Sequence, residues 1–244
     1  MADLKESPVQ RRVADKRAIL REHFLFGRLS PHHLDRLSAC IVTKSVKRGT
    51  SIFSKGDPGS SMLAIAKGTV RISVPVADGH DVVFNLLGKG EIFGEIALLD
   101  GRTRTADAIA VTDCELFVIE RRDFLPLVRE DSEIALELIE VLCLRLRRQS
   151  TQAEDVMFHN LPSRLAKALL RLADVGAGAA PAPQRKVTIT QRDLGNMIGM
   201  SRESTNKQLR IWEKCKWVRL DRGVIEIVSS SNLAEIAEDD CYDD

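Results

Sequence analysis

Residues 93–99 read Phe-Gly-Glu-Ile-Ala-Leu-Leu, and residues 104–106 read Arg-Thr-Ala. This stretch places a carboxylate, Glu95, and a cation, Arg104, around a glycine-containing bend between segments that read as strands. Desolvating such a pair costs free energy, so charged pairs are usually exposed or hold a ligand. Glu95 can accept hydrogen bonds from sugar hydroxyls, and Arg104 can donate two parallel hydrogen bonds to a phosphate. Backbone N–H groups after Gly94 can face the same anion if a short helix begins there. The residues therefore predict a site for a small molecule that carries a ribose and a phosphate.

The chain around this stretch, from residue 42 to 119, indicates an antiparallel β-roll or sandwich. Short alternating apolar runs are separated by turn-forming residues at regular spacing. The turn signals are Gly49, Gly56-Asp57-Pro58-Gly59, Gly68, Asp78-Gly79, Gly88-Lys89-Gly90 and Asp100-Gly101. Residues 1–12 are expected to be disordered. Residues 13–39 carry helical spacing in two short pieces broken near Gly27, and Ser30-Pro31 predicts a helix start.

Residues 131–158 predict one long helix. Its apolar and small residues repeat at alternating steps of three and four, which is the spacing of a heptad seam. The seam consists of Leu136, Ile139, Cys143, Leu146, Ser150, Ala153 and Met157. A second apolar set flanks it and consists of Ile134, Leu138, Val141 and Leu142. One interpretation is a helix packed on its own sheet. The other is a parallel dimer seam, with the second set lying on the roll.

The C-terminal part follows the order helix, turn, helix and hairpin. A helix is expected from Leu161-Pro162 to about Ala173, then a loop at 176–183 and a short strand at 187–189. Thr190 followed by Asp193 resembles a capping box and opens a helix to Ile198, and Ser201 caps the next helix, which reaches about Lys214. Strand, turn and strand follow over residues 218–227. This order is typical of a winged helix-turn-helix.

Charge is distributed unevenly along a chain that is nearly neutral as a whole. The 244 residues contain 44% hydrophobic and 29% charged side chains, which suits two globular domains, and the formal net charge is +1. Residues 160–226 contain 13 Lys and Arg against 6 Asp and Glu, whereas residues 227–244 contain 6 acidic and no basic residues. The sequence therefore predicts a basic module followed by an acidic tail, whose last residues, 238–244, we expect to be solvated and disordered.

Several classes of protein and site are not indicated. The five cysteines form no closely spaced pair, so no zinc or iron–sulfur site is predicted, and we expect most of them to be buried. The polar N-terminus predicts no signal peptide and no apolar run is long enough to span a bilayer, so we expect a cytoplasmic protein without membrane contact. His32-His33 are expected to face solvent, and no nucleophile–base–orienter set predicts an enzyme.

The helix that begins at Ser201 has two nearly polar first turns. Helical periodicity puts Arg202, Glu203, Asn206 and Lys207 on one surface, with Arg210 further along. Arginine donors match guanine edges, glutamate can accept from cytosine, and serine or threonine hydroxyls bind phosphates. Such a helix, preceded by a glycine turn and followed by a basic hairpin, predicts DNA recognition.

Roughly residues 20–230 resemble the CRP/FNR superfamily of bacterial transcription regulators. The resemblance rests on Gly49…Ile52-Phe53…Gly56-Asp57, Gly68-Thr69-Val70-Arg71-Ile72, Phe93-Gly94-Glu95…Arg104-Thr105-Ala106 and Ser201-Arg202-Glu203. It implies an α+β fold with an N-terminal cyclic-nucleotide-binding, jelly-roll-like β-roll, a long dimerisation helix and a C-terminal winged helix-turn-helix. We place these at residues 1–130, 131–158 and 159–230, with the acidic tail at 231–244.

The resemblance also implies residue roles. Gly94 and Glu95 match positions that hold the ribose, Arg104 matches the arginine that pairs with the cyclic phosphate, and Gln149 and Ser150 match positions that touch the purine. The predicted nucleotide-binding set is Gly94, Glu95, Ile96, Ala97, Arg104, Thr105, Ala106, Gln149 and Ser150. Arg202, Glu203 and Lys207 match base-reading positions. The predicted DNA-binding set is Thr190, Gln191, Ser201, Arg202, Glu203, Ser204, Asn206, Lys207 and Arg210.

Two departures from the family pattern bear on specificity. Gln149 stands where threonine is usual in the cyclic-AMP-binding relative, and a glutamine side chain can donate to and accept from either adenine or guanine. Cyclic AMP is the favoured effector, and cyclic GMP stays open. Lys207 replaces an arginine and loses its bidentate geometry. We expect a homodimer that binds near-palindromic double-stranded DNA under cyclic-nucleotide control, with RNA polymerase as a further partner. The alternatives are a regulator that binds DNA without a cyclic nucleotide or with another effector, and a nucleotide-gated subunit that acts on a protein partner.

Overall fold

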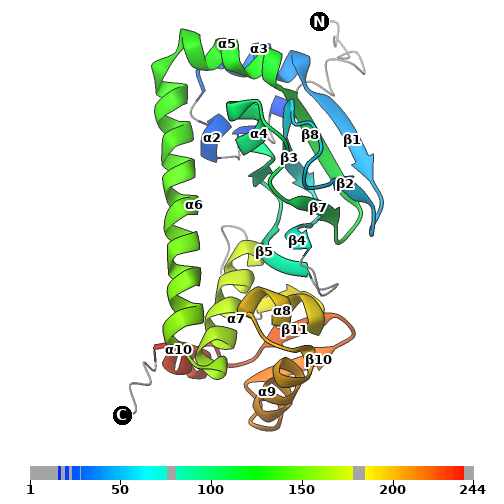
Figure 1. Ribbon diagram of the computed structural model, residues 1–244, viewed down its shortest axis with the longest axis vertical. Coiled ribbons are helices and arrows are strands. Elements are labelled where there is room, and N and C mark those ends of the chain that lie inside the picture. The colour runs from blue at the N-terminus through cyan, green and yellow to red at the C-terminus, as the bar shows by residue number, and fades with distance from the viewer. Residues whose placement is uncertain are drawn as a thin grey trace, which may run out of the picture. The chain divides into compact units, whose positions relative to one another are not determined.

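The computed structural model describes residues 16–17, 20–21, 24–27, 29–75, 81–177 and 185–238 (Figure 1). These residues form two compact units, one made by the chain up to Arg71 and by Leu87–Arg145, the other by Ile72–Leu86 and the chain from Leu146 onward. The predicted disorder of residues 1–12, the predicted loop from residue 178 to 183 and residues 239–244 of the predicted tail lie outside the described residues.

The first unit contains helices α2 (Phe24–Gly27) and α3 (Pro31–Cys40). Ser30 caps α3, because its hydroxyl accepts a hydrogen bond from the backbone N–H of His33 at 3.2 Å. Proline at the first helical position loses no hydrogen bond, since that N–H has no partner within the helix. The helix start predicted from Ser30-Pro31 is confirmed.

Within the described residues 42–75 and 81–120, eight strands build the roll that the turn signals predicted. They are β1 (Val42–Val46), β2 (Ser51–Phe53), β3 (Ser61–Lys67), β4 (Val70–Pro75), β5 (Asp81–Leu87), β6 (Ile92–Phe93), β7 (Asp107–Ala110) and β8 (Cys114–Glu120). One sheet has the order β1-β8-β3-β6 and the other β2-β7-β4-β5. The pairs β1–β8, β3–β8, β3–β6 and β2–β7 are antiparallel, with Leu63 opposite Val118 in the central pair.

Helices α4 (Glu95–Asp100) and α5 (Arg121–Glu130) each follow a strand of the roll, and α6 (Ser132–Phe158) follows α5. In the first unit, Phe124 and Leu127 of α5 and Ile134 and Leu138 of α6 are buried in one core with apolar residues of β3, β6 and β8. The second apolar set predicted on the long helix therefore begins as the face that packs on the roll.

The second unit contains α7 (Leu161–Ala177), β9 (Arg185–Thr188), α8 (Gln191–Ile198), α9 (Arg202–Lys214), β10 (Val218–Asp221), β11 (Val224–Ile227) and α10 (Ser230–Glu238). The three strands form a sheet of order β10-β11-β9. Gly195 of α8 lies where α8 and α9 meet, because a Cβ there would be 2.8 Å from the carbonyl oxygen of Met200 and 3.0 Å from Thr205 Oγ1. The winged helix-turn-helix expectation is confirmed.

Two boundaries predicted in this unit are wrong. The loop expected from Gly176 begins later, because α7 continues to Ala177, and a single glycine costs a helix only about 1 kcal/mol. The acidic tail expected from residue 231 begins as helix α10, whose Leu233 and Ala237 are buried. Ser163 of α7 donates a hydrogen bond to the carbonyl of Ala237, so α10 is packed into the second unit. The acidic composition obscured two apolar residues at helical spacing.

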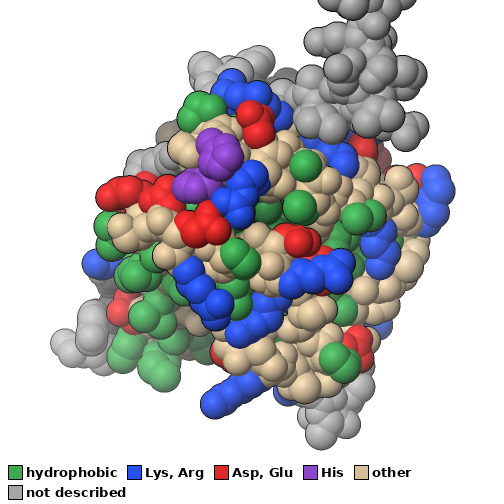
Figure 2. All heavy atoms as spheres, turned by 90° about the horizontal axis from the view of Figure 1, so that it is seen from above, with side chains coloured by type: hydrophobic (Ala, Val, Ile, Leu, Met, Phe, Trp, Pro, Cys, Tyr) green, Lys and Arg blue, Asp and Glu red, His purple; other side chains and the backbone are tan. Residues whose placement is uncertain are grey.

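The face seen in Figure 2 carries interspersed acidic and basic side chains, with histidine side chains among them. His33 is half-buried, with Nδ1 3.1 Å from Asp131 Oδ2, so only His32 faces solvent as expected. Of the four described cysteines, Cys114 is buried and the other three are exposed, so the expectation of mostly buried cysteines is wrong. Among the described residues, no helix is long and apolar enough to cross a membrane, and no group of metal-binding side chains occurs.

Candidate functional site

Arg104 lies in the loop between α4 and β7, and its backbone is fixed by the turn at residues 56–57. Its N–H donates to the carbonyl of Asp57 at 2.8 Å, and its own carbonyl accepts from the N–H of Gly56 at 2.9 Å. The Gly56-Asp57 and Arg104-Thr105-Ala106 stretches, which are almost fifty residues apart in the sequence, therefore hold one another in place.

The side chain of Arg104 is buried, with 6% exposure. Nη1 donates to the carbonyl oxygens of Ser61 at 2.6 Å and Gly94 at 2.8 Å, and Nη2 donates to Ser61 Oγ at 3.1 Å. The guanidinium carbon lies 4.2 Å from the centre of the Phe53 ring, which is a cation–π distance. These contacts fix the plane and direction of the guanidinium.

In the part of the chain that the structure describes, the charge of Arg104 has no direct counterion. Burial lowers the pKa of its guanidinium, while the more distant charges of Glu95, Asp57 and Glu120 act in the opposite direction. Among the described residues no carboxylate forms an ion pair with it, and its Nε is buried without a hydrogen-bond partner. A buried cation with an unused donor fits an anion such as a phosphate.

Glu95 forms an ion pair with Arg145 and not with Arg104. Glu95 is 3% exposed, and its Oε1 lies 2.5 Å from Nη1 of Arg145 on α6. Arg145 also donates to the carbonyl of Ile92. No local pattern indicates Arg145, because its partner is fifty positions away and its neighbours are other arginines and leucines.

Gly94 is required at the bend that presents Glu95. It adopts a left-handed conformation with φ of 78°, and a Cβ there would lie 2.5 Å from Arg104 Nη1. Residues 94–97 and 104–106 thus lie in the same unit, joined by the bond from Arg104 to Gly94. Ile96 and Thr105 are exposed, and Ala97 and Ala106 are buried.

The two predicted base-contacting residues lie on α6 beyond Arg145. Gln149 and Ser150 are both exposed, and Ser150 Oγ donates to the carbonyl of Leu146 at 3.1 Å. Gln149 is one helical turn after Arg145, a spacing at which side chains on one helix are neighbours. They belong to the second unit, whereas Glu95 and Arg104 belong to the first.

All seven residues of the predicted seam on α6 are exposed in the single chain. The large ones are strongly so, with Leu136 at 58%, Ile139 at 55%, Leu146 at 65% and Met157 at 74%. Figure 2 shows hydrophobic side chains gathered at its lower left, on the side where α6 runs in Figure 1. An exposed apolar stripe of this length is typical of an interaction surface.

Helices α8 and α9 begin with the caps that the sequence predicted. Thr190 Oγ1 accepts from the N–H of Asp193 at 3.0 Å and donates to its carboxylate, and Ser201 Oγ accepts from the N–H of Ser204 at 3.1 Å. Thr205, Leu209 and Trp212 bury one face of α9. The predicted contact residues otherwise divide by exposure: Thr190, Ser201, Arg202, Glu203, Lys207 and Arg210 are exposed, and Gln191, Ser204 and Asn206 are half-buried.

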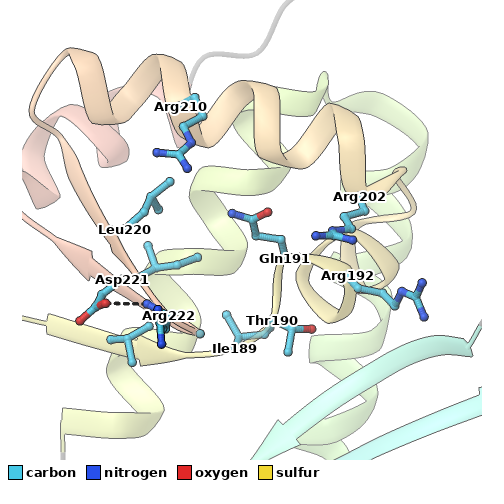
Figure 3. Close-up of a pocket in the computed structure, with 12 residues that line it drawn as sticks. Ile189, Thr190, Gln191, Arg192, Arg202, Arg210, Leu220, Asp221 and Arg222 are labelled. Carbon is cyan, nitrogen blue, oxygen red and sulfur yellow. Dashed lines mark hydrogen bonds between the residues drawn. The ribbon is translucent and has the colours of Figure 1, made fainter.

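A hollow of about 650 Å³ lies between α9, the start of α8 and the hairpin of β10 and β11. Figure 3 shows Arg210 and Arg202 reaching from α9 and Gln191 from α8, with Leu220, Asp221 and Arg222 on the hairpin side. Arg192 and Arg222 also line the hollow, and the set predicted from the sequence does not include them. Their signal was the basic turn Asp221-Arg222-Gly223 and a single arginine in the first turn of α8.

Two parts of the chain match known protein families. Residues 43–131 match the cyclic nucleotide-binding domain family, and residues 163–236 match the Crp-like helix-turn-helix domain family. The chain is 30% identical over 220 residues to a CRP-like cAMP-activated global transcriptional regulator of Mycobacterium tuberculosis, covering 90% of this chain and 98% of that protein. It is 34% identical over 213 residues to a cyclic AMP receptor protein of Thermus thermophilus, covering 87% and 96%.

A solved structure shows the same fold. A CRP/FNR-family transcriptional regulator of Thermus thermophilus superposes with a TM-score of 0.68 at 26% identity, covering 82% of this chain and 100% of that one. A match of this extent includes residues of both units.

Proposed function

Because the chain belongs to the CRP/FNR family of transcription regulators, we propose that it acts as a homodimer that binds near-palindromic DNA under the control of cyclic AMP. The observation that carries the nucleotide part is the buried guanidinium of Arg104, which has no ion-pair partner among the described residues and an unused Nε donor. Relatives named as cAMP-activated or as a cyclic AMP receptor support cyclic AMP over cyclic GMP.

In the proposed complex, the cyclic phosphate binds Nε and the free N–H of Arg104, with the Thr105 hydroxyl as a neighbour. A ribose hydroxyl donates to Glu95, whose carboxylate has room for more than one hydrogen bond. Gln149 and Ser150 contact the base. Since Ser150 also belongs to the exposed seam, the second subunit's helix completes the base contacts.

Dimerisation along α6 buries the exposed seam and sets the spacing of the two α9 helices. A two-fold dimer that reads successive major grooves needs them about 34 Å apart. Nucleotide binding then favours one arrangement of the two DNA-binding units, and by linkage DNA tightens nucleotide binding by the same factor. RNA polymerase is the further proposed partner, and the protein acts in the cytoplasm, where a bacterial chromosome lies.

Calorimetry of the full chain with cyclic AMP and with cyclic GMP tests the nucleotide part. We expect saturable binding of cyclic AMP, and absence of binding to both nucleotides at millimolar concentration would contradict the proposal. Fluorescence anisotropy with a duplex that the protein selects from a random pool tests the DNA part, with and without nucleotide.

The outcomes of these two measurements distinguish the alternatives. DNA binding that is unchanged by either nucleotide identifies a regulator that works without them or with another effector. Nucleotide binding without any DNA binding, at low salt where phosphate contacts are strongest, identifies a subunit that acts on a protein partner.

A further inference from the structure

One carboxylate, Glu213, joins α9, the predicted recognition helix, to the wing, which is the hairpin of β10 and β11. Its Oε2 accepts from Nη1 of Arg210, one turn earlier on α9, at 2.6 Å. Its Oε1 accepts from the backbone N–H of Leu220 in β10 at 3.2 Å. The hydrogen bond from Arg210 and then that from Leu220 lower the pKa of the Glu213 carboxyl, so it is ionised at neutral pH.

Both partners of Glu213 line the hollow between α9 and the wing, together with Arg202 and Arg222. Figure 3 shows the Arg210 side chain directed from α9 toward the strand that carries Leu220. Arg210 is exposed, and the bond to Glu213 uses only Nη1. An arginine has five N–H donors in a fixed fork, so the remaining donors of Arg210 are available to an anion.

We propose that Glu213 is a positioning residue for DNA binding, which orients Arg210 over the hollow and fixes the wing beside it, so that both bind phosphates of one duplex. The inference rests on the proposed DNA binding and adds a residue outside the predicted contact set. An exposed ion pair within one helix contributes little by itself. Here the second bond, to the backbone of another element, ties the arginine to the surface with which it must act. Ordering a long side chain before binding lowers the cost of ordering it on binding.

Glu213 could also weaken DNA binding, because a carboxylate near DNA repels phosphates. The sign of the change in affinity on Glu213→Gln therefore decides between the two roles. Glutamine keeps an oxygen that can accept from the N–H of Leu220 but loses the charge that holds Arg210.

The test is fluorescence anisotropy of the full chain with the selected duplex, with and without cyclic AMP, over a series of salt concentrations. E213Q is expected to weaken binding about 3- to 10-fold and to reduce the slope of log K against log salt by about one, the effect of one lost phosphate contact. R210A is expected to do the same, and the double variant no more than R210A alone. The matched control is Glu235→Gln on α10, which removes the same charge from the same unit without contacting the hollow and is not expected to weaken binding.

Three results would overturn the proposal: E213Q binding DNA as tightly as the unaltered chain or more tightly, E213Q weakening binding equally in the R210A background, or R210A leaving affinity and salt slope unchanged. The last does not depend on whether E213Q folds, since Arg210 is exposed and its removal leaves the bond from Glu213 to the wing. If the unaltered chain binds no DNA, the proposed function itself fails.

Discussion

Replacing Arg104 by leucine should remove most of the nucleotide affinity while leaving the roll folded. In the free protein the substitution removes three hydrogen bonds, to two carbonyls and one hydroxyl, and it also removes a buried cation that has no ion-pair partner among the described residues. These effects oppose each other, since an apolar side chain in place of a buried charge is often nearly neutral. We therefore expect the free energy of unfolding to change by less than about 2 kcal/mol.

In the proposed nucleotide complex, R104L loses both the charge and the hydrogen-bond donors that bind the phosphate, and both losses lower the affinity. Removing one partner of a buried ion pair costs about 3 to 5 kcal/mol, which corresponds to a roughly 10²- to 10⁴-fold increase in Kd for cyclic AMP. Calorimetry measures the affinity and urea denaturation measures the stability. Arg104→Lys is the matched control, because lysine keeps the charge but not the forked donors. Its Kd for cyclic AMP should lie between those of the original protein and of R104L. An R104L protein that binds cyclic AMP within a factor of about three of the original would refute the assignment of Arg104 to the phosphate.

Three further predictions concern other parts of the molecule. Arg145→Met leaves the buried carboxylate on α4 without its ion-pair partner and should destabilise the roll by about 3 kcal/mol in urea denaturation; no loss would mean that the ion pair contributes nothing. Leu146→Glu, in the exposed seam, should convert a dimer into a monomer in sedimentation, whereas Leu144→Glu, exposed on the same helix but outside the seam, should not. The folded-state pKa of Glu213 lies below its ordinary value of 4.5, so its contribution to stability is present above that pH and lost as pH falls through the lowered pKa. The difference in thermal midpoint between E213Q and the original chain should accordingly vanish in acid, and a constant difference would contradict this.

The local rules of the sequence predicted most of the fold. Ser30, Thr190 and Ser201 cap helices because a hydroxyl that precedes a helix satisfies an N–H with no partner inside it, and this needs only neighbouring residues. Turn-forming residues also act through their immediate neighbours, and they divide the roll into strands. The prediction of an acidic tail from residue 231 is wrong where α10 forms, because it rests on net charge. Leu233 and Ala237, spaced i and i+4, are sufficient to bury one face of a helix.

The sequence marks candidate residues for the site but does not indicate which side chains pair with them. Gly94, Glu95 and Arg104 are marked by their types and spacing, yet the actual partners of the two charges, Arg145 and Ser61, come from elements about fifty and forty positions away. A charge in a sequence indicates that a counter-charge or donor is needed. Which one supplies it depends on how the strands and helices are packed, and no local pattern contains that information.

The pairing that the sequence missed also explains how a nucleotide could influence α6. Glu95 begins α4, and its carboxylate is the ion-pair partner of Arg145 on the long helix. In the proposed complex, a ribose hydroxyl that donates to Glu95 would draw on the negative charge that holds Arg145, so nucleotide binding would change the strength of a buried contact on α6. The earlier turns of the same helix attach to the roll through apolar side chains, since Ile134 and Leu138 are buried in its core and Val141 packs against it. The first unit therefore holds α6 on the roll both by the Glu95–Arg145 ion pair and by apolar packing. Of these two contacts, a polar ligand that binds Glu95 would alter the ion pair.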